Sequence, residues 1–264
     1  MKRWPYWVLG FWLVVVACSL LYDMQPDAIS LEQVLAPPGK STLLGTDDLG
    51  RNIAVRLAAG AGVSMLVALA VTAVTLTLGT MIGLLSGYCG GWVDRLLMQV
   101  TDVFLAFPGI LLAIAFAAVL GPGLDNLLLA LCMTSWVGYA RLTRAQALSL
   151  RQRQHVQAAQ SLGASAGRIM RKHMLPLLAA PLVVEATYSI AGLVIAEASL
   201  SFLGLGIQAP HASWGSMLRD GVRYLLVAPH YVLAVGISLM SVVLAVNVLG
   251  DQLRDAWDVR RAKD

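Results

Sequence analysis

Charged side chains are scarce in this chain of 264 residues: Asp, Glu, Lys and Arg together make up 13%, against roughly 25% in an average soluble domain. Cysteine is also rare, and the three present, Cys18, Cys89 and Cys132, provide no disulfide framework. What the chain has instead is apolar, with 58% hydrophobic residues and a mean hydropathy of +0.73. This composition excludes soluble globular, disordered and coiled-coil proteins, and it predicts an all-α membrane protein.

Signatures of several chemistries are absent as well. The segment GKST at 39–42 lacks the earlier glycine of a phosphate-binding loop, because that position is Val34. The four histidines form no HExxH pattern, and no Cys/His cluster has metal-ligand spacing. In GASAG at 163–167, basic residues follow Ser165 closely, which places this serine in a polar loop. We therefore expect no catalytic residue, no metal, no cofactor and no ATP site in this chain.

Apolar stretches of about 20 residues, the length that crosses a bilayer, occur six times. A polar segment separates the first two, and a basic segment at 140–176 separates the last two from the others. We divide the chain into an N-terminal anchor helix with an external segment (1–57), a transmembrane domain (58–250) that contains the cytoplasmic loop 140–176, and a C-terminal tail (251–264). The predicted spans are Trp4–Tyr22, Gly62–Tyr88, Leu96–Leu120, Leu124–Tyr139, Leu177–Leu203 and Tyr224–Leu249.

Basic residues are distributed unevenly between the two sides of these spans. With the N-terminus inside, 14 of the 19 Lys and Arg residues lie on the inner side, which predicts that both termini are cytoplasmic. This topology accounts for the net charge of +4 without nucleic acid as a partner. A lipoprotein signal cleaved at Cys18 is an alternative, but the apolar run continues to Tyr22 and favours an anchor helix. Trp4, Trp7 and Trp12 are expected to anchor that helix at the membrane interface.

Three acidic residues lie within predicted spans: Asp102, Glu185 and Glu197. A charge at this depth costs about 2.5–3.5 kcal/mol on insertion scales, so each should face the bundle interior, a partner subunit or water. We interpret them as candidates for a translocation pathway. A structural role stays open for all three, above all for Asp102, which follows Arg95 by about two helical turns. Pro108 in the same span is expected to kink it.

The cytoplasmic loop contains a short amphipathic pattern. Val156, Ala159 and Leu162 recur at helical spacing opposite Arg and Gln positions, which predicts a short helix with one apolar face. That face must be buried against the protein's own bundle, in the headgroup layer or against a partner. The small residues at 163–167 predict a turn, with Ser165 at the N-cap of the next helix.

This loop resembles the EAA loop in the permease subunits of binding-protein-dependent ABC importers. The resemblance rests on Ala158-Ala159, on Gly163 and on the pattern His173-x-Leu175-Pro176. It implies that the loop docks on an ATPase subunit as a coupling helix. Gln157 replaces the usual glutamate, so it donates and accepts hydrogen bonds but makes no ion pair. The coupling residues implied by the resemblance are Val156, Gln157, Ala158, Ala159, Leu162, Gly163, His173 and Pro176.

Other segments are similar to the dipeptide, oligopeptide and nickel branch of this family. They are LGTDDLGRN at 44–52, with Asn52 in place of the usual aspartate, EASLSFLGLG at 197–206, and GDQLRD at 250–255. The resemblance implies a type I ABC importer permease fold with six transmembrane helices in the bacterial inner membrane. It also implies two ATP-binding subunits, a second homologous permease subunit, an external solute-binding protein and membrane lipid as partners.

The chain is thus expected to form half of a translocation pathway, while ATP is hydrolysed in partner subunits. For the substrate we favour nickel or a metal chelate, because the segments at 139–141 and 149–153 look closer to nickel permeases. The alternative is a dipeptide or oligopeptide. A secondary transporter is a distant alternative that needs discontinuous helices and usually internal repeats. An intramembrane protease is another, and it needs Ser165 at membrane depth.

Overall fold

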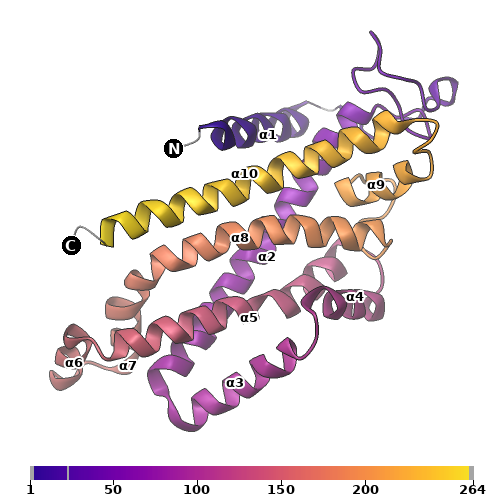
Figure 1. Cartoon of the computed structure of the whole chain (residues 1–264). Helices are drawn as coiled ribbons and strands as arrows, with labels where there is room; N and C mark the ends of the chain where they lie inside the picture. Colours follow the sequence, from indigo (N-terminus) through magenta and orange to yellow (C-terminus); the bar gives the residue numbers. More distant parts are fainter. Residues whose placement is uncertain (1–2, 23, 262–264) are drawn as a thin grey trace.

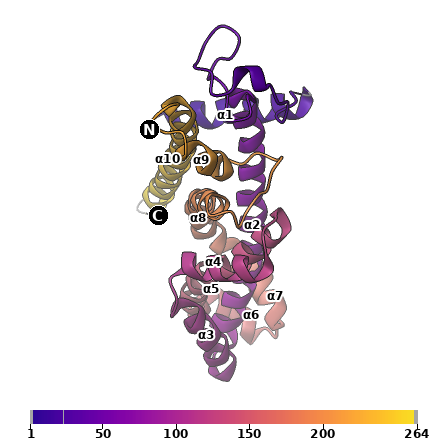
Figure 2. The same cartoon turned by 90° about the vertical axis from the view of Figure 1, so that its right-hand side faces the viewer.

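The computed structural model describes residues 3–22 and 24–261. Within these residues the fold is built from helices, with one isolated β-bridge between Thr46 and Asn52. Helices α5, α8 and α10 lie side by side, and α2 crosses them on one side (Figure 1, Figure 2). The helices are α1 (Trp4–Leu21), α2 (Ile53–Cys89), α3 (Gly91–Leu105), α4 (Gly109–Leu120), α5 (Leu124–Arg151), α6 (Gln154–Ser161), α7 (Ala166–Ile169), α8 (Leu175–Phe202), α9 (Trp214–Val222) and α10 (Pro229–Arg261), with a 3-10 turn at Leu31–Gln33 and a π-helical turn at Met170–Met174.

Four segments of the described chain are long and apolar enough to cross a membrane: α1, α2, Ala166–Phe202 and Pro229–Trp257. Helices α3 and α4 add a fifth if this bent pair counts as one span. The predicted fourth span is the first half of α5, whose second half carries three arginines and is more polar. Length and composition therefore support four or five spans rather than the six predicted.

The two ends of the helical bundle carry different parts of the chain. The start of α1, the end of α10, α6 and α7 lie at one end, and residues 24–52 lie with α9 at the other (Figure 1). This is the arrangement that the predicted orientation needs, although the side of the membrane stays a prediction. Two lysines used for it, Lys2 and Lys263, lie outside the described residues, as does the end of the predicted tail at 262–264. The described part of that tail continues α10.

Three glycines allow α2 to lie close against α5. Gly79, Gly83 and Gly87 follow one another at four-residue intervals and share one face of α2. A Cβ atom on Gly83 would lie 2.3 Å from the carbonyl oxygen of Ala140, and one on Gly79 would lie 2.5 Å from that of Trp136. Small residues at such intervals let the backbones of membrane helices approach closely. This contact fixes the position of α5, which leads into α6.

Trp12 attaches α1 to the bundle. Its side chain is buried, and its Nε1 donates a 3.0 Å hydrogen bond to the hydroxyl of Ser241 on α10. Its ring meets the ring of Trp214 on α9 edge to face, with 5.0 Å between the centroids. The prediction of an interfacial anchor is therefore wrong for Trp12, because its indole packs inside the protein. Trp4 and Trp7 are exposed, as that role requires.

Pro108 separates two helices rather than kinking one. Helix α3 ends at Leu105 and α4 begins at Gly109, and the two helices are bent by 84°. Proline has no N–H to donate and disfavours a helical conformation at the preceding residue, Phe107. The predicted third span is thus a broken element, in which an amphipathic α3 precedes a short apolar α4.

Residues 24–52 fold around a buried carboxylate. Asp47 is fully buried, and its Oδ1 accepts hydrogen bonds from the backbone N–H groups of Leu49 at 3.0 Å and Arg51 at 2.9 Å. Its Oδ2 lies 2.7 Å from Nε of Arg51 and 3.3 Å from Nε of Arg56. Arg56 also pairs with Asp27 at 3.0 Å. Because a buried carboxylate needs such partners, the conspicuous motif at 44–52 is explained as a folding element.

The same motif starts α2. The side chain of Asn52 caps the helix by accepting a 3.0 Å hydrogen bond from the N–H of Ala54. Asn and Asp are equally good N-caps, which explains why asparagine serves where the family usually has aspartate. Burial raises the pKa of the neighbouring Asp48, and the negative charges of Asp47 and Asp220 raise it further, against the opposing effect of Arg51.

Candidate functional site

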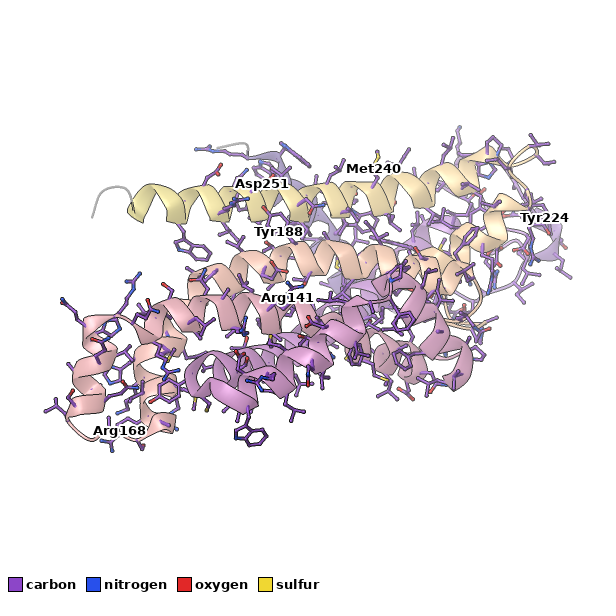
Figure 3. All side chains as sticks on the ribbon, turned by 60° about the horizontal axis from the view of Figure 1, so that its bottom comes forward. Arg141, Arg168, Tyr188, Tyr224, Met240 and Asp251 are labelled. Atoms are coloured by element: carbon purple, nitrogen blue, oxygen red, sulfur yellow. The ribbon has the colours of Figure 1, made fainter. Side chains whose placement is uncertain are left out.

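The loop at 140–176 contains α6, a tight turn and α7 at one end of the bundle, where Arg168 is exposed (Figure 3). Val156 and Ala159 of α6 are buried in a cluster with Leu150 of α5 and Leu178 of α8. The apolar face of the predicted helix thus packs on the protein's own bundle, one of the three environments considered for it. Helix α6 is therefore tied by its apolar face to both α5 and α8.

Leu162 does not belong to that face. Helix α6 ends at Ser161, and the side chain of Leu162 is 87% exposed. The prediction that Leu162 shares the buried face is wrong, because the helix stops before it. Gln157 and Ala158 are exposed on the outer side of α6. The exposed surface of the segment therefore combines an amide, a small residue and one large apolar side chain.

Gly163 closes α6 with a Schellman motif. Its N–H donates to the carbonyl of Gln160 at 2.9 Å, and the N–H of Ala164 donates to the carbonyl of Ala159 at 3.0 Å. The backbone φ of Gly163 is +78°, a region that favours glycine. A Cβ atom at this position would meet nothing within 4 Å. The requirement for glycine is therefore conformational rather than steric.

His173 and Pro176 mark the passage from α7 into α8. His173 is half-buried in the π-helical turn, an element frequently found at functional sites. Pro176 is exposed in the first turn of α8, where its missing N–H costs no helical hydrogen bond. Ser165 occupies the N-cap of α7 as predicted, without a hydrogen bond from its side chain.

The structure separates the three acidic candidates. Glu197 is fully buried, and its carboxylate accepts hydrogen bonds from Ser64 of α2 at 2.6 Å and Ser201 of α8 at 2.8 Å. Asp102 is exposed on α3, close enough to Arg144 of α5 for their charges to interact. Glu197 therefore connects α8 with α2, and Asp102 lies where α3 approaches α5.

Arg144 also fixes the start of α3. Its Nε and terminal nitrogen lie 2.5 and 2.7 Å from the two carboxylate oxygens of Asp94, and Ser86 of α2 donates to the same carboxylate. Paired hydrogen bonds of this kind hold both partners in a defined geometry. The inner ends of α2, α3 and α5 are therefore bound together.

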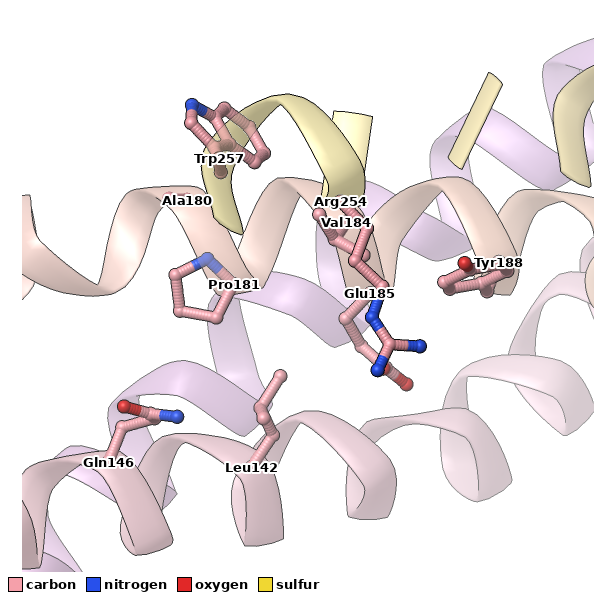
Figure 4. Close-up of a pocket in the computed structure, with 9 residues that line it drawn as sticks. All are labelled: Leu142, Gln146, Ala180, Pro181, Val184, Glu185, Tyr188, Arg254 and Trp257. Carbon is pink, nitrogen blue, oxygen red and sulfur yellow. The ribbon is translucent and has the colours of Figure 1, made fainter. Parts of the chain in front are cut away.

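Glu185 lies in a groove between α5 and α8. The inner part of this groove is a cavity of about 360 Å³ that α10 closes on one side (Figure 4). Glu185 is half-buried and forms no hydrogen bond or ion pair with another described residue. Tyr188 donates a 2.6 Å hydrogen bond to Asp251 of α10 beside it (Figure 3). The cavity is lined by Leu142, Gln146, Ala180, Pro181, Val184, Glu185, Tyr188, Arg254 and Trp257.

A second cavity, of about 500 Å³, lies farther along the same helices, between α4, α5 and α8. The hydroxyl groups of Thr134 and Ser135 on α5 and of Ser189 on α8 contribute polar surface to its wall. Gly192 on α8 lines the same cavity. Ser189 follows Glu185 by four residues, so the two cavities share one face of α8. We call these two cavities, with residues 185–199 of α8 and 131–146 of α5 along them, the α5–α8 groove.

The groove supplies a carboxylate, an amide and several hydroxyls, which are groups that hydrate or bind a polar solute. Among residues 3–22 and 24–261, no group of three His, Cys, Asp or Glu is placed to hold a metal ion. Sequence reasoning missed Ser135, Ser189 and Arg254. The four-residue spacing of Glu185 and Ser189 was a readable signal, whereas Arg254 approaches from a helix far along the chain.

Comparison with known families identifies this architecture. Residues 79–261 match the family described as binding-protein-dependent transport system inner membrane component. A dipeptide transport system permease protein of Alkalihalophilus pseudofirmus is 40% identical over 251 residues, which cover 95% of this chain and 83% of the relative. A glutathione transport system permease protein of Pectobacterium atrosepticum is 39% identical over 249 residues, with coverage of 93% and 83%.

A third relative and a solved structure extend this result. A di/tripeptide transport system permease protein of Pseudomonas aeruginosa is 39% identical over 262 residues, covering 95% of this chain and 86% of the relative. The inward-facing methionine ABC transporter MetNI matches with a TM-score of 0.58 and 20% identity, over 76% of this chain and 95% of the matched chain. That identity supports the fold alone. The chain therefore belongs to the family of binding-protein-dependent transport system inner membrane components, and it is a multi-pass permease subunit of an ABC importer in the bacterial inner membrane.

Proposed function

We propose that this chain forms half of the translocation pathway of a peptide importer, with the α5–α8 groove as its wall. The observation that carries this proposal is the polar face formed by Ser135, Glu185 and Ser189 on membrane helices. Polar groups within a membrane face water, a cavity or a partner, because lipid does not satisfy them. Of the three acidic candidates, Glu185 is the one we retain in the pathway, and we assign positioning roles to Asp102 and Glu197.

Peptides are the substrate class that we favour. The three relatives described above are named for dipeptides, di- and tripeptides and glutathione, which supports the peptide alternative better than nickel. The segments at 139–141 and 149–153, which favoured nickel from the sequence, have no such support. The permease itself needs no cofactor in this proposal, and ATP hydrolysis resides in partner subunits.

The assembly that we propose has six spanning elements in this chain, with α5 and the broken α3–α4 pair included and both termini in the cytoplasm. The transmembrane domain is residues 58–250 with the loop 140–176, preceded by the anchor and external segment at 1–57 and followed by the tail at 251–264. A second homologous permease subunit faces the α5–α8 groove and closes the pathway. Two ATP-binding subunits lie at the end that carries α6 and α7, and an external solute-binding protein delivers peptide at the opposite end.

Coupling to the ATPase takes place at α6 in this proposal. The exposed Gln157, Ala158 and Leu162 contact the ATPase subunit, while Val156 and Ala159 attach α6 to the bundle. A movement of α6 therefore reaches α5 and α8 through the buried cluster that they share. For ATP to shift the bundle between inward and outward access, the ATPase must bind one state more tightly than the other. Gly163 sets the turn, and the segment with His173 and Pro176 transmits the movement to α8.

Uptake assays test the substrate class. Cells with and without this gene, both with the partner subunits present, take up labelled dipeptide and labelled nickel side by side. We expect loss of dipeptide uptake alone when the gene is removed. Loss of nickel uptake alone would contradict the proposal and restore the metal as substrate.

A pair of glycine substitutions tests the groove. A Cβ atom on Gly192, which lines the outer cavity, or on Gly236 of α10, which does not, would meet nothing within 4 Å. Gly192→Leu should therefore fill the groove and lower dipeptide uptake about tenfold or more at equal membrane levels. Gly236→Leu is the matched control and should transport normally. Equal uptake by the two variants would show that the groove is not the pathway.

A further inference from the structure

We propose that the inner cavity of the α5–α8 groove binds a zwitterion, specifically a peptide with free amino and carboxyl termini. This inference rests on the proposed function as a peptide importer and adds a recognition site to it. The cavity contains two opposite charges from different helices, Glu185 on α8 and Arg254 on α10 (Figure 4). Both side chains project into the space between α5, α8 and α10.

Glu185 has no ion-pair partner among the described side chains, whereas Arg254 is exposed and lies close enough to Tyr188 to interact with its hydroxyl. Among the side chains that the structure describes, which on α10 end at Trp257, no ion pair of 4.0 Å or less joins Glu185 to Arg254 or either of them to another residue. A half-buried carboxylate without a partner retains a desolvation cost, which a cationic ligand group removes. A guanidinium presents a fork of donors that matches a carboxylate. The cavity therefore offers one site for an ammonium group and one for a carboxylate.

The combination of charges selects the ligand class. A bare cation is attracted by Glu185 but repelled by Arg254. A simple anion is attracted by Arg254 but repelled by Glu185. A solute that carries both charges satisfies both groups at once. A free peptide is such a solute, because its amino terminus is cationic and its carboxyl terminus anionic near neutral pH.

The remaining walls fit the rest of a short peptide. Gln146 supplies an amide that donates and accepts hydrogen bonds, as peptide groups require. Leu142, Pro181 and Trp257 provide apolar surface for a side chain. The volume of about 360 Å³ lies at the low end of small-molecule sites, which span about 300–1000 Å³. Tyr188, held by its hydrogen bond to Asp251, forms a positioned wall to one side of the two charges.

The test measures binding of a labelled dipeptide to the complete importer in nanodiscs, with all membrane and ATPase subunits and without the binding protein. Equilibrium dialysis compares the free dipeptide with its N-acetylated and C-amidated forms. For the free dipeptide we expect Glu185→Gln and Arg254→Gln each to weaken binding about tenfold. Glu185→Gln should not weaken binding of the anionic N-acetylated form, and Arg254→Gln should not weaken binding of the cationic C-amidated form, because each variant removes a charge that repels that form.

The paired outcomes separate recognition from structural damage. A variant that merely distorts the cavity weakens all three forms alike, and that result would overturn the proposal. Asp255→Asn is the matched control, because Asp255 is exposed beside Arg254 and does not line the cavity. It should bind all three forms as the unaltered importer does.

Uptake with the binding protein present, measured on the same importer, distinguishes failure of the zwitterion site from failure of the proposed function. An importer that transports dipeptides but shows no terminus-dependent effect of either variant refutes the zwitterion site and leaves the proposed function intact. An importer that transports no peptide refutes the proposed function itself.

Discussion

The hydroxyl of Ser64 on α2 donates a 2.6 Å hydrogen bond to the buried carboxylate of Glu197 on α8, across 133 positions of sequence. Ser201 donates to the same carboxylate at 2.8 Å. Ala196 and Ser199, close to Glu197 on the same helix, line the α5–α8 groove instead. Glu197 thus attaches one side of α8 to α2 while the other side of α8 faces the groove.

Replacing Glu197 should lower the stability of the protein rather than block transport directly. Glu197→Ala leaves Ser64 and Ser201 without their acceptor, and we expect the free energy of unfolding to fall by about 1–3 kcal/mol. Glu197→Gln retains the size of the side chain and one acceptor oxygen, so the free energy of unfolding should fall less. Thermal unfolding of the purified importer measures both, with the exposed Val183→Ala on the same helix as control. Unchanged stability combined with lost uptake would instead place Glu197 in the pathway.

Gly83→Ala should disrupt the contact between α2 and α5. The added Cβ atom would lie 2.3 Å from the backbone oxygen of Ala140, which cannot rotate away. Overpacking of this kind costs about 1–3 kcal/mol or more. We expect less assembled permease in the membrane, measured by quantitative immunoblotting. Gly62→Ala on the same helix is the control, because its Cβ atom would lie at an ordinary 3.6 Å from Val16. Equal amounts of the two variants would contradict the close contact.

Gly163 and Gly167 provide a matched pair for the coupling loop. A Cβ atom on either would meet nothing within 4 Å, but only Gly163 has a positive φ. Gly163→Ala should therefore strain the turn by about 1–2 kcal/mol and displace the exposed face of α6. We expect dipeptide uptake to fall several-fold at unchanged membrane levels, while Gly167→Ala transports normally. If both variants transport normally, the geometry of this turn is not needed for coupling.

Asp48 should make stability depend on pH. Burial and the charges of Asp47 and Asp220 raise the pKa of Asp48. A carboxyl group whose pKa rises on folding stabilises the folded state fully below its unfolded value, about 3.9. That contribution is lost as the pH rises through the folded value. Asp48→Asn, which does not ionise, should therefore be more stable than the unaltered chain at pH 7.

Thermal midpoints of the purified importer between about pH 4 and pH 8 test this prediction. The advantage of Asp48→Asn should shrink towards pH 4. Glu32→Gln, at an exposed position of the same segment at 24–52, is the control. An advantage that grows on acidification would contradict the assigned cause.

Several features of the site were predictable because they depend on local sequence. The amphipathic pattern predicted the helix α6, and the family motif led us to propose this loop as the coupling segment. The missing N–H of Pro108 predicted a disturbance in the third span, although its size, an 84° break, depends on what surrounds the two helices. Leu162 shows the limit of periodicity, because the spacing of apolar residues does not state where a helix ends.

By itself the sequence determined that this protein is helical, that it lies in a membrane and that it resembles importer permeases, because length, hydropathy and motifs are properties of short segments. The tertiary structure decided where the acidic residues lie and what they contact. Glu185 and Glu197 occupy the same apolar helix twelve positions apart, and only the neighbours of each side chain distinguish a groove from an interhelical contact. Likewise, Arg254 lines the same cavity as Glu185 only because α10 packs beside α8, since contacts between distant segments depend on how the helices pack together.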